Sequence, residues 1–234
     1  MIKYADTLPE FEADKISLAK ILSQYKAFGN TPISPGFWIQ GTGGKVTAVI
    51  SLYGHELTLY CKGGNLEEIW DFIRVIHPKR VFTEMENLMA PCDARIKQVF
   101  LKKLPVKEVL RGTEVSLKEL YDRLLSGQDG DVSLPRFEDF CGDISHRLRH
   151  GGAVAIAKDF GAAISFLFEG GGIISGIAVD KACRGKGFGS KLLKEICKIS
   201  GGDIFACTDE SNKDFYIKNG FSYIGDAVYL EMER

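Results

Sequence analysis

The feature that most constrains this chain is a glycine-rich turn near residue 185, between a strand pattern and a helix pattern. Residues 173–179 are mostly apolar and predict a buried strand, and an amphipathic pattern from about 189 to 199 predicts a helix. The turn between them reads Arg-Gly-Lys-Gly-Phe-Gly over residues 184–189. The first N–H groups of a helix have no helical partner, and glycine has no Cβ to keep a ligand away from them. The turn therefore predicts a binding site for a phosphate or diphosphate group.

Several ligands use such a turn, and an ordinary tight connection between strand and helix is also compatible with it. A Walker A loop needs Gly-Lys followed by Ser or Thr, whereas residues 189–191 read Gly-Ser-Lys. A dinucleotide fingerprint needs a third glycine where Ser190 stands, although Asp209 and Glu210 follow the next strand pattern at a suitable offset. Coenzyme A is the third class of ligand that fits.

Two motifs together resemble those of the GNAT superfamily of N-acetyltransferases. The first is Arg184-x-x-Gly187-x-Gly189, after a strand and at the start of a helix. The second is the segment 215–221, Phe-Tyr-Ile-Lys-Asn-Gly-Phe, which resembles the Tyr-x-x-x-Gly-Phe element of that family. The likeness covers residues 104–234.

The resemblance implies an α/β (α+β) fold, with a mixed and mostly antiparallel sheet flanked by helices. We expect residues 104–234 to form a GNAT domain that binds acetyl-CoA and carries the catalysis. Residues 1–103 share a coarse order of helix, three strands, helix and strand, so we expect a degenerate GNAT-like N-terminal domain. Their nearest equivalent of the turn, Lys62-Gly63-Gly64-Asn65, lacks the spaced basic residue and the second glycine turn, and we expect no diphosphate there.

The resemblance also implies roles for individual residues. Tyr216 would act as the general acid for the departing thiolate, because a phenol of pKa about 10 can protonate or hydrogen-bond a thiolate whose thiol pKa is about 8.5. An amine would attack the thioester directly, and a strand N–H such as that of Val179 would stabilise the developing oxyanion. The expected acetyl-CoA contacts are Ile177, Ala178, Val179, Arg184, Gly185, Lys186, Gly187, Phe188, Gly189, Ser190, Asn212 and Phe215.

The chain departs from the family pattern at two points. The family often has an asparagine seven positions before the tyrosine, where this chain has Asp209, so Asn212 is a weak substitute. Residues 173–179 also contain no glutamate to deprotonate the amine. The candidates for a general base are Glu169, Asp180, Glu210 and His146, and a chain of waters is an equal alternative.

We therefore predict an acetyl-CoA-dependent N-acetyltransferase acting on a primary amine, either a small molecule or a peptide. The alternatives are a CoA-binding sensor or scaffold without catalysis and, from a different class, a nicotinamide-nucleotide enzyme. His146 and His150 could both reach one metal ion from a helix, but no third ligand is evident, so we expect no metal.

The composition indicates which partners and which cellular compartment to expect for this protein. Thirty basic and 31 acidic residues give a net charge of -1, which argues against nucleic acid as a partner. No apolar run is long enough to cross a membrane, and residues 1–6 contain no signal-peptide pattern. The six cysteines are scattered without a Cys-x-x-Cys pair, so we expect reduced thiols and a cytoplasmic protein.

The remaining patterns predict the order of elements. Helices are expected at 16–25, 65–76, 116–125, 136–150 and 213–219, and strands at 36–40, 45–52, 56–61, 80–84, 153–157, 162–168 and 204–208. Residues 93–104 predict another short element. Residues 221–224 and 228–232 predict two closing strands.

Overall fold

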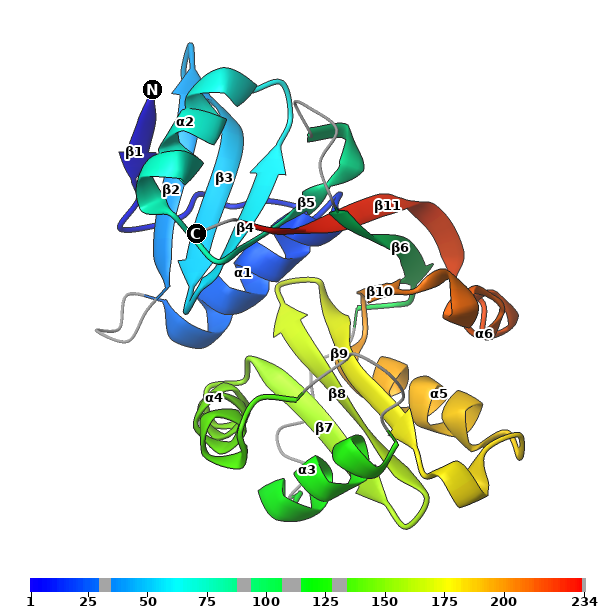
Figure 1. Cartoon of the computed structure of the whole chain (residues 1–234). Coiled ribbons are helices and arrows are strands. Elements are labelled where there is room, and N and C mark those ends of the chain that lie inside the picture. The colour runs from blue at the N-terminus through cyan, green and yellow to red at the C-terminus, as the bar shows by residue number, and fades with distance from the viewer. Residues whose placement is uncertain (30–34, 88–93, 107–114, 128–133, 233–234) are drawn as a thin grey trace. The chain divides into compact units, whose positions relative to one another are not determined.

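The computed structural model describes residues 1–29, 35–87, 94–106, 115–127 and 134–232, and these residues form two compact units (Figure 1). The first unit consists of Met1–Phe100, Cys207–Lys213 and Tyr223–Arg234. The second consists of Leu101–Ala206 and Asp214–Ser222. Each unit is therefore built from more than one stretch of the chain.

The first unit is a mixed sheet with helices on both faces (Figure 1). Most neighbouring strands are antiparallel, and β4 and β5 are parallel. The last strand of the chain lies beside β5 in this unit and pairs with it at Ala227–Glu231. The strands, in sheet order, are β1 (Ile2–Tyr4), β2 (Gly36–Thr42), β3 (Lys45–Tyr53), β4 (Glu56–Cys61), β5 (Arg80–Glu84), β11 (Ser222–Glu231) and β6 (Ala94–Lys103).

The two helices of the first unit, α1 (Ile16–Phe28) and α2 (Leu66–Ile76), cover opposite faces of the sheet. Alternation along the strands explains this, because successive side chains of a strand point to opposite faces. In β3, Ala48 and Ile50 pack in the cluster that contains Ile69 and Ile73 of α2. The intervening Val49 packs with residues of α1. Strand β3 is thus buried on both sides.

The second unit contains the strands β10 (Asp203–Thr208), β9 (Gly171–Val179), β8 (Gly161–Phe168) and β7 (Ala153–Lys158), in that order. Strands β7, β8 and β9 are antiparallel neighbours, whereas β10 runs parallel to β9. The helices are α3 (Leu117–Ser126), α4 (Phe137–Arg149), α5 (Phe188–Ser200) and the short α6 (Lys213–Lys218).

Alternation also places the helices of the second unit. In β8, Ala162 and Ile164 belong to the apolar cluster of α3 and α4. Ser165 lies on the opposite face, where Gly172 of β9 is packed against both Ser165 and Ser200 of α5. Helix α5 is anchored there by Leu192, Leu193, Ile196 and Cys197, all of them buried. Its N-terminal turn therefore has a fixed place at the end of β9.

The predicted fold class is confirmed, since the structure is a mixed, mostly antiparallel sheet flanked by helices. The prediction of two closing strands is wrong, because Ser222–Glu231 form one continuous strand. Gly225, at φ 137°, lets the strand bend without ending. The short strand β1 was not predicted. The domain boundary at residues 103 and 104 remains a prediction, whereas the compact units change at Phe100 and again at residues 207–213 and 223–234.

Candidate active site

The candidate site begins at the loop that connects β9 to α5. One turn of 3₁₀ helix, Lys181–Cys183, follows the strand. Gly185 and Gly187 then adopt φ angles of 73° and 80°, which residues with a Cβ rarely adopt. An ideal Cβ built on either glycine meets no atom within 4 Å. The loop thus requires glycine for its backbone and leaves open space around it.

The amide groups of this loop are available to a ligand. The first backbone hydrogen bond of α5 runs from Lys191 N–H to the Gly187 carbonyl. Within the described part of the chain, no N–H group of residues 185–190 donates a hydrogen bond to the protein. The first turn of α5 has no side-chain cap and contains no acidic residue. The positive end of the helix dipole is therefore free to attract an anion.

The basic side chains of the loop brace it from within. The Arg184 guanidinium donates hydrogen bonds to the carbonyls of Val179 (3.3 Å) and Gly127 (2.8 Å). The Lys186 ammonium donates to the Ala182 carbonyl at 2.9 Å. Both charges lie in the loop, as the sequence predicts, but their hydrogen bonds to carbonyl groups tie the loop to its surroundings.

Strand β9 extends past its pairing with β10. The parallel ladder pairs Asp203–Ala206 with Gly171–Ile174 and goes no further. A register shift opposite Ile164 and Ser165 of β8 then marks a bulge at Ser175. Residues 177–179 continue to pair with β8 and are half-buried. Among the described residues their other edge has no β10 partner, and the Val179 carbonyl on this stretch accepts from Arg184.

An aromatic group from α6 lies against the first turn of α5. An ideal Cβ on Gly189 would be 3.2 Å from the Phe215 ring, so glycine permits this close approach. The Tyr216 ring is next, with its centroid 5.2 Å from that of Phe215 and 5.3 Å from that of Phe221. Tyr216 is 5% exposed. The predicted acid is thus buried one ring away from the amide row.

Most of the predicted site residues come together in the second unit. They are Ile177, Ala178, Val179, Arg184, Gly185, Lys186, Gly187, Phe188, Gly189, Ser190, Phe215 and Tyr216. Asn212 belongs to the first unit, where its exposed amide donates to Thr208 Oγ1 at 3.1 Å. The structure therefore gathers every predicted residue except Asn212 into one unit.

The candidate bases are less well defined. The Asp180 carboxylate accepts hydrogen bonds from Arg123 (2.7 Å) and Ser126 (2.5 Å), so both of its oxygens have partners within the protein. Glu169 and Glu210 are exposed, and the His146 ring lies against that of His150 with centroids 4.3 Å apart. No group of three or more His, Cys, Asp or Glu side chains in the described residues could hold a metal ion.

Sequence reasoning missed the end of helix α3 as part of this site. Arg123, Ser126 and Gly127 all contact β9 or the loop, although 54 to 57 positions separate the hydrogen-bonded partners. No periodicity or local motif connects residues so far apart. Only the packing of α3 on β9 reveals them.

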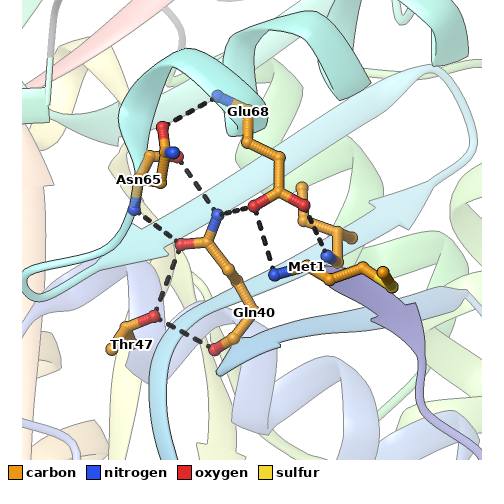
Figure 2. Close-up of polar contacts among 6 residues, drawn as sticks. Met1, Gln40, Thr47, Asn65 and Glu68 are labelled. Atoms are coloured by element: carbon orange, nitrogen blue, oxygen red, sulfur yellow. Dashed lines mark hydrogen bonds and ion pairs between the residues drawn. The ribbon is translucent and has the colours of Figure 1, made fainter. Parts of the chain in front are cut away.

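The corresponding turn of the first unit, between β4 and α2, is filled by the protein itself (Figure 2). The Gln40 side chain is 1% exposed; its carbonyl accepts from Asn65 N–H at 2.8 Å, and its NH₂ donates to the Asn65 carbonyl and to Glu68. Asn65 caps α2 by accepting from Glu68 N–H. Two acidic residues, Glu67 and Glu68, occupy the first turn. This turn offers no site for an anion.

The comparisons with known proteins agree with this geometry. Residues 149–223 match the family model described as an acetyltransferase (GNAT) domain. This match confirms the predicted GNAT resemblance of the second half of the chain, and it indicates acyl transfer as the general chemistry of the domain. No curated protein matches the sequence.

Solved structures share the fold over the whole chain. A GNAT-family acetyltransferase from Colwellia psychrerythraea is 12% identical, with a TM-score of 0.55 and coverage of 100% of both chains. A GCN5-related N-acetyltransferase from Sphaerobacter thermophilus is 15% identical, with a TM-score of 0.53, and the match covers 91% of this chain and 90% of the other. One from Kribbella flavida is 11% identical, with a TM-score of 0.54 and coverage of 92% and 93%.

Proposed function

We propose that this protein is an N-acetyltransferase that uses acetyl-CoA, because residues 149–223 match the family model described as an acetyltransferase (GNAT) domain. The observation that carries the proposal is the row of N–H groups over residues 185–190, which lie at a helix N-terminus with no acidic residue in its first turn and without protein partners among the described residues. Bound acetyl-CoA would supply the acetyl group as an activated thioester. The acceptor in this proposal is a primary amine, carried by a small molecule or a peptide.

The chain's own residues have distinct roles in this proposal. The amides of residues 185–190 would bind the diphosphate, with Gly185 and Gly187 leaving room for it and the Arg184 side chain at its rim. The backbone of residues 177–179, with Ala178 in its centre, would bind the pantetheine arm along the edge that β10 leaves unpaired. Phe188 and Phe215 would flank the ligand at the first turn of α5, and Asn212 stays a weaker candidate for a contact.

Tyr216 is the proposed general acid. Its phenol would hold a proton for the departing sulfur, and its low exposure would limit competition from water. The Tyr216→Phe variant keeps the ring packed against Phe215 and Phe221 and removes only the hydroxyl. We expect kcat to fall about 100-fold with little change in CoA affinity. An unchanged kcat would remove Tyr216 from the mechanism.

Calorimetry with CoA tests the binding part of the proposal directly. We expect a saturable heat with a dissociation constant in the micromolar range and a stoichiometry of one per chain, because the proposal assigns the diphosphate to the single row of amides over residues 185–190. A folded protein that gives no heat at high micromolar CoA would defeat the proposal.

A CoA-binding module without catalysis is the second candidate function. One observation favours it, namely that both oxygens of the Asp180 carboxylate near the loop are already held by Arg123 and Ser126. Acetyl-CoA turnover with a panel of primary amines distinguishes the two candidates, since the module would bind CoA and transfer nothing.

The cellular location and the partners of the protein are also part of the proposal. We place it in the cytoplasm, where the free thiols of Cys61, Cys141, Cys183, Cys197 and Cys207 would stay reduced. Cys92 lies outside the described residues. In the described part of the chain, no helix is both long and apolar enough to cross a membrane. We propose neither nucleic acid nor a lipid bilayer as a partner.

A further inference from the structure

The loop that carries the open amides has few restraints of its own besides the hydrogen bonds of Arg184 and Lys186. Gly185 and Gly187 have the widest conformational freedom of any residue type, and no atom lies within 4 Å of where their side chains would be. Within residues 184–187, only Arg184 and Lys186 have side chains that can restrain the loop, and all four residues are exposed. A row of amides binds a diphosphate well only if it is already aligned, because ordering the loop on binding costs affinity. Something outside the loop must therefore fix it.

The C-terminal end of helix α3 provides that restraint through Asp180, the residue that connects β9 to the loop. Arg123 Nη1 donates to Asp180 Oδ2 at 2.7 Å, and Ser126 Oγ donates to Asp180 Oδ1 at 2.5 Å. Both carboxylate oxygens are thus held by residues of one helix. The backbone of Asp180 is also fixed, since its N–H donates to the Phe160 carbonyl and its carbonyl accepts from Cys183 N–H.

The loop also donates a hydrogen bond back to helix α3. Arg184, four residues further along the loop, sends its guanidinium back to the carbonyl of Gly127, the C-cap of α3. Gly127 itself lies directly on β9, where an ideal Cβ would be 2.6 Å from Ala178 Cβ and 3.0 Å from Val179 N. Helix α3 therefore contacts the strand and both ends of the 180–184 segment.

We propose that Asp180 is a positioning residue for the amide row of residues 185–190, acting through Arg123 and Ser126 of α3. The inference rests on the proposed function, because the consequence of the positioning is affinity for the diphosphate of CoA. It also assigns a role to a carboxylate that would otherwise be counted among the candidate bases.

Two effects of removing Asp180 oppose each other. Loss of the restraint weakens binding, whereas loss of a negative charge near the loop favours an anion. Arg123 already neutralises this carboxylate, and the pair is only partly exposed, with 31% and 20% of the two side chains accessible. A double variant, Arg123→Ala with Asp180→Ala, keeps the net charge of the chain constant and removes only the restraint. Any loss of affinity in the double variant therefore cannot come from net charge.

The matched control lies on the same helix. Lys118 and Asp122 form an exposed pair at 3.2 Å that lines the same cavity as Asp180 without forming an ion pair with it, so Lys118→Ala with Asp122→Ala removes one charge of each sign nearby and keeps the restraint. We expect this control to leave both CoA affinity and the loop unchanged. Ser126→Ala is a milder variant that keeps the ion pair and loses one hydrogen bond.

The test combines two measurements on the full chain. Hydrogen exchange of a peptide covering residues 180–190, without ligand, should become faster in the Arg123→Ala/Asp180→Ala variant, because the N–H groups of Cys183 and Arg184 are hydrogen-bonded in the intact segment. Calorimetry should show CoA affinity about tenfold weaker in that variant and about twofold weaker in Ser126→Ala. If the double variant fails to fold, Ser126→Ala carries the same test.

The outcomes separate the two proposals. Unchanged exchange and unchanged affinity in folded variants that bind CoA would overturn the positioning role, as would an equal loss in the Lys118 and Asp122 control. Faster exchange in a chain whose wild type binds no CoA would overturn the proposed function and leave the structural restraint standing.

Discussion

Two strand–turn–helix segments of this protein share a topology, but side chains hydrogen-bond the backbone amides in one of them and not in the other. In the first unit β4 leads through a glycine turn into α2, and in the second unit β9 leads through a glycine turn into α5. Each of these strands is parallel to the strand that follows the helix. The α2 turn is closed by the side chains of Gln40 and Asn65, whereas the α5 turn has no side-chain cap.

The comparison shows that a glycine with positive φ before a helix does not by itself make an anion site. Gly63 has φ 78° with open space around it, and Gly187 has φ 80° with open space around it. What differs is the occupation of the amides and the charge of the first helical turn, which contains Glu67 and Glu68 in α2 and no acidic residue in α5. The chain thus contains its own control for the proposed site.

The largest expected effect comes from placing a carboxylate at each turn. Gly187→Glu should weaken CoA binding more than 100-fold, equivalent to at least about 2.7 kcal/mol, because it puts a negative charge where the diphosphate would lie. Gly63→Glu introduces the same side chain at nearly the same φ, with a similar backbone strain of about 1–2 kcal/mol. It should leave CoA affinity unchanged. Calorimetry on both variants measures the difference.

The comparison would break if both variants behaved alike. Equal loss of binding would mean that strain at any glycine turn disrupts the site, and equal retention would mean that the α5 turn is not where CoA binds. Denaturant unfolding of both variants provides the check that each is folded at the temperature of the titration.

A smaller effect is expected from opening the closed turn. Gln40→Ala leaves the Asn65 N–H and the Glu68 carboxylate without a buried amide partner, so it should lower the free energy of unfolding by about 2 kcal/mol. It should not create CoA binding, since Glu67 and Glu68 still repel an anion at the first turn. Urea unfolding measures the change, and CoA binding by the Gln40→Ala variant would contradict the assigned role of the acidic turn.

Much of the fold could be predicted from the sequence because its signals are local. Strand β5 is predicted at its observed bounds of Arg80–Glu84, and α5 at one residue from each end, since a short β-like run marks the strand and an amphipathic pattern after the glycine turn marks the helix. The amide row follows from the same turn. What could not be predicted depends on contacts between distant residues, namely the closure of the α2 turn by Gln40, 25 positions from Asn65, and the restraint of the loop by Arg123, 57 positions from Asp180. The local sequence of a glycine turn does not show whether a side chain from a distant part of the chain will occupy its amides.

The smallest expected effect extends the comparison to a third helix, α1, whose N-terminus is occupied by a buried carboxylate. Glu84, 5% exposed, accepts hydrogen bonds from Ser17 N–H (3.0 Å) and Ser17 Oγ (2.7 Å). Burial raises the pKa of this carboxyl above its ordinary value of 4.5, although the two Ser17 bonds act in the opposite direction. The folded state thus holds its proton more tightly than the unfolded state does. Stability from this group is therefore complete below pH 4.5 and is lost as the pH rises through the raised pKa.

Glu84→Gln removes this titration while keeping an oxygen to accept from Ser17. We expect the free energy of unfolding of the wild type, relative to the variant, to decrease as the pH rises above 4.5, with a difference at neutral pH within about 1 kcal/mol. Urea unfolding at a series of pH values from 4 to 7 measures it. The Glu84 carboxylate lies at the N-terminus of α1, as we propose that the diphosphate of the ligand lies at the N-terminus of α5. The free energy needed to ionise the buried Glu84 side chain indicates why α5 has no such internal carboxylate. If the difference between wild type and variant instead increased with pH, the Ser17 bonds would outweigh burial, and Glu84 would be a stabilising internal anion of α1.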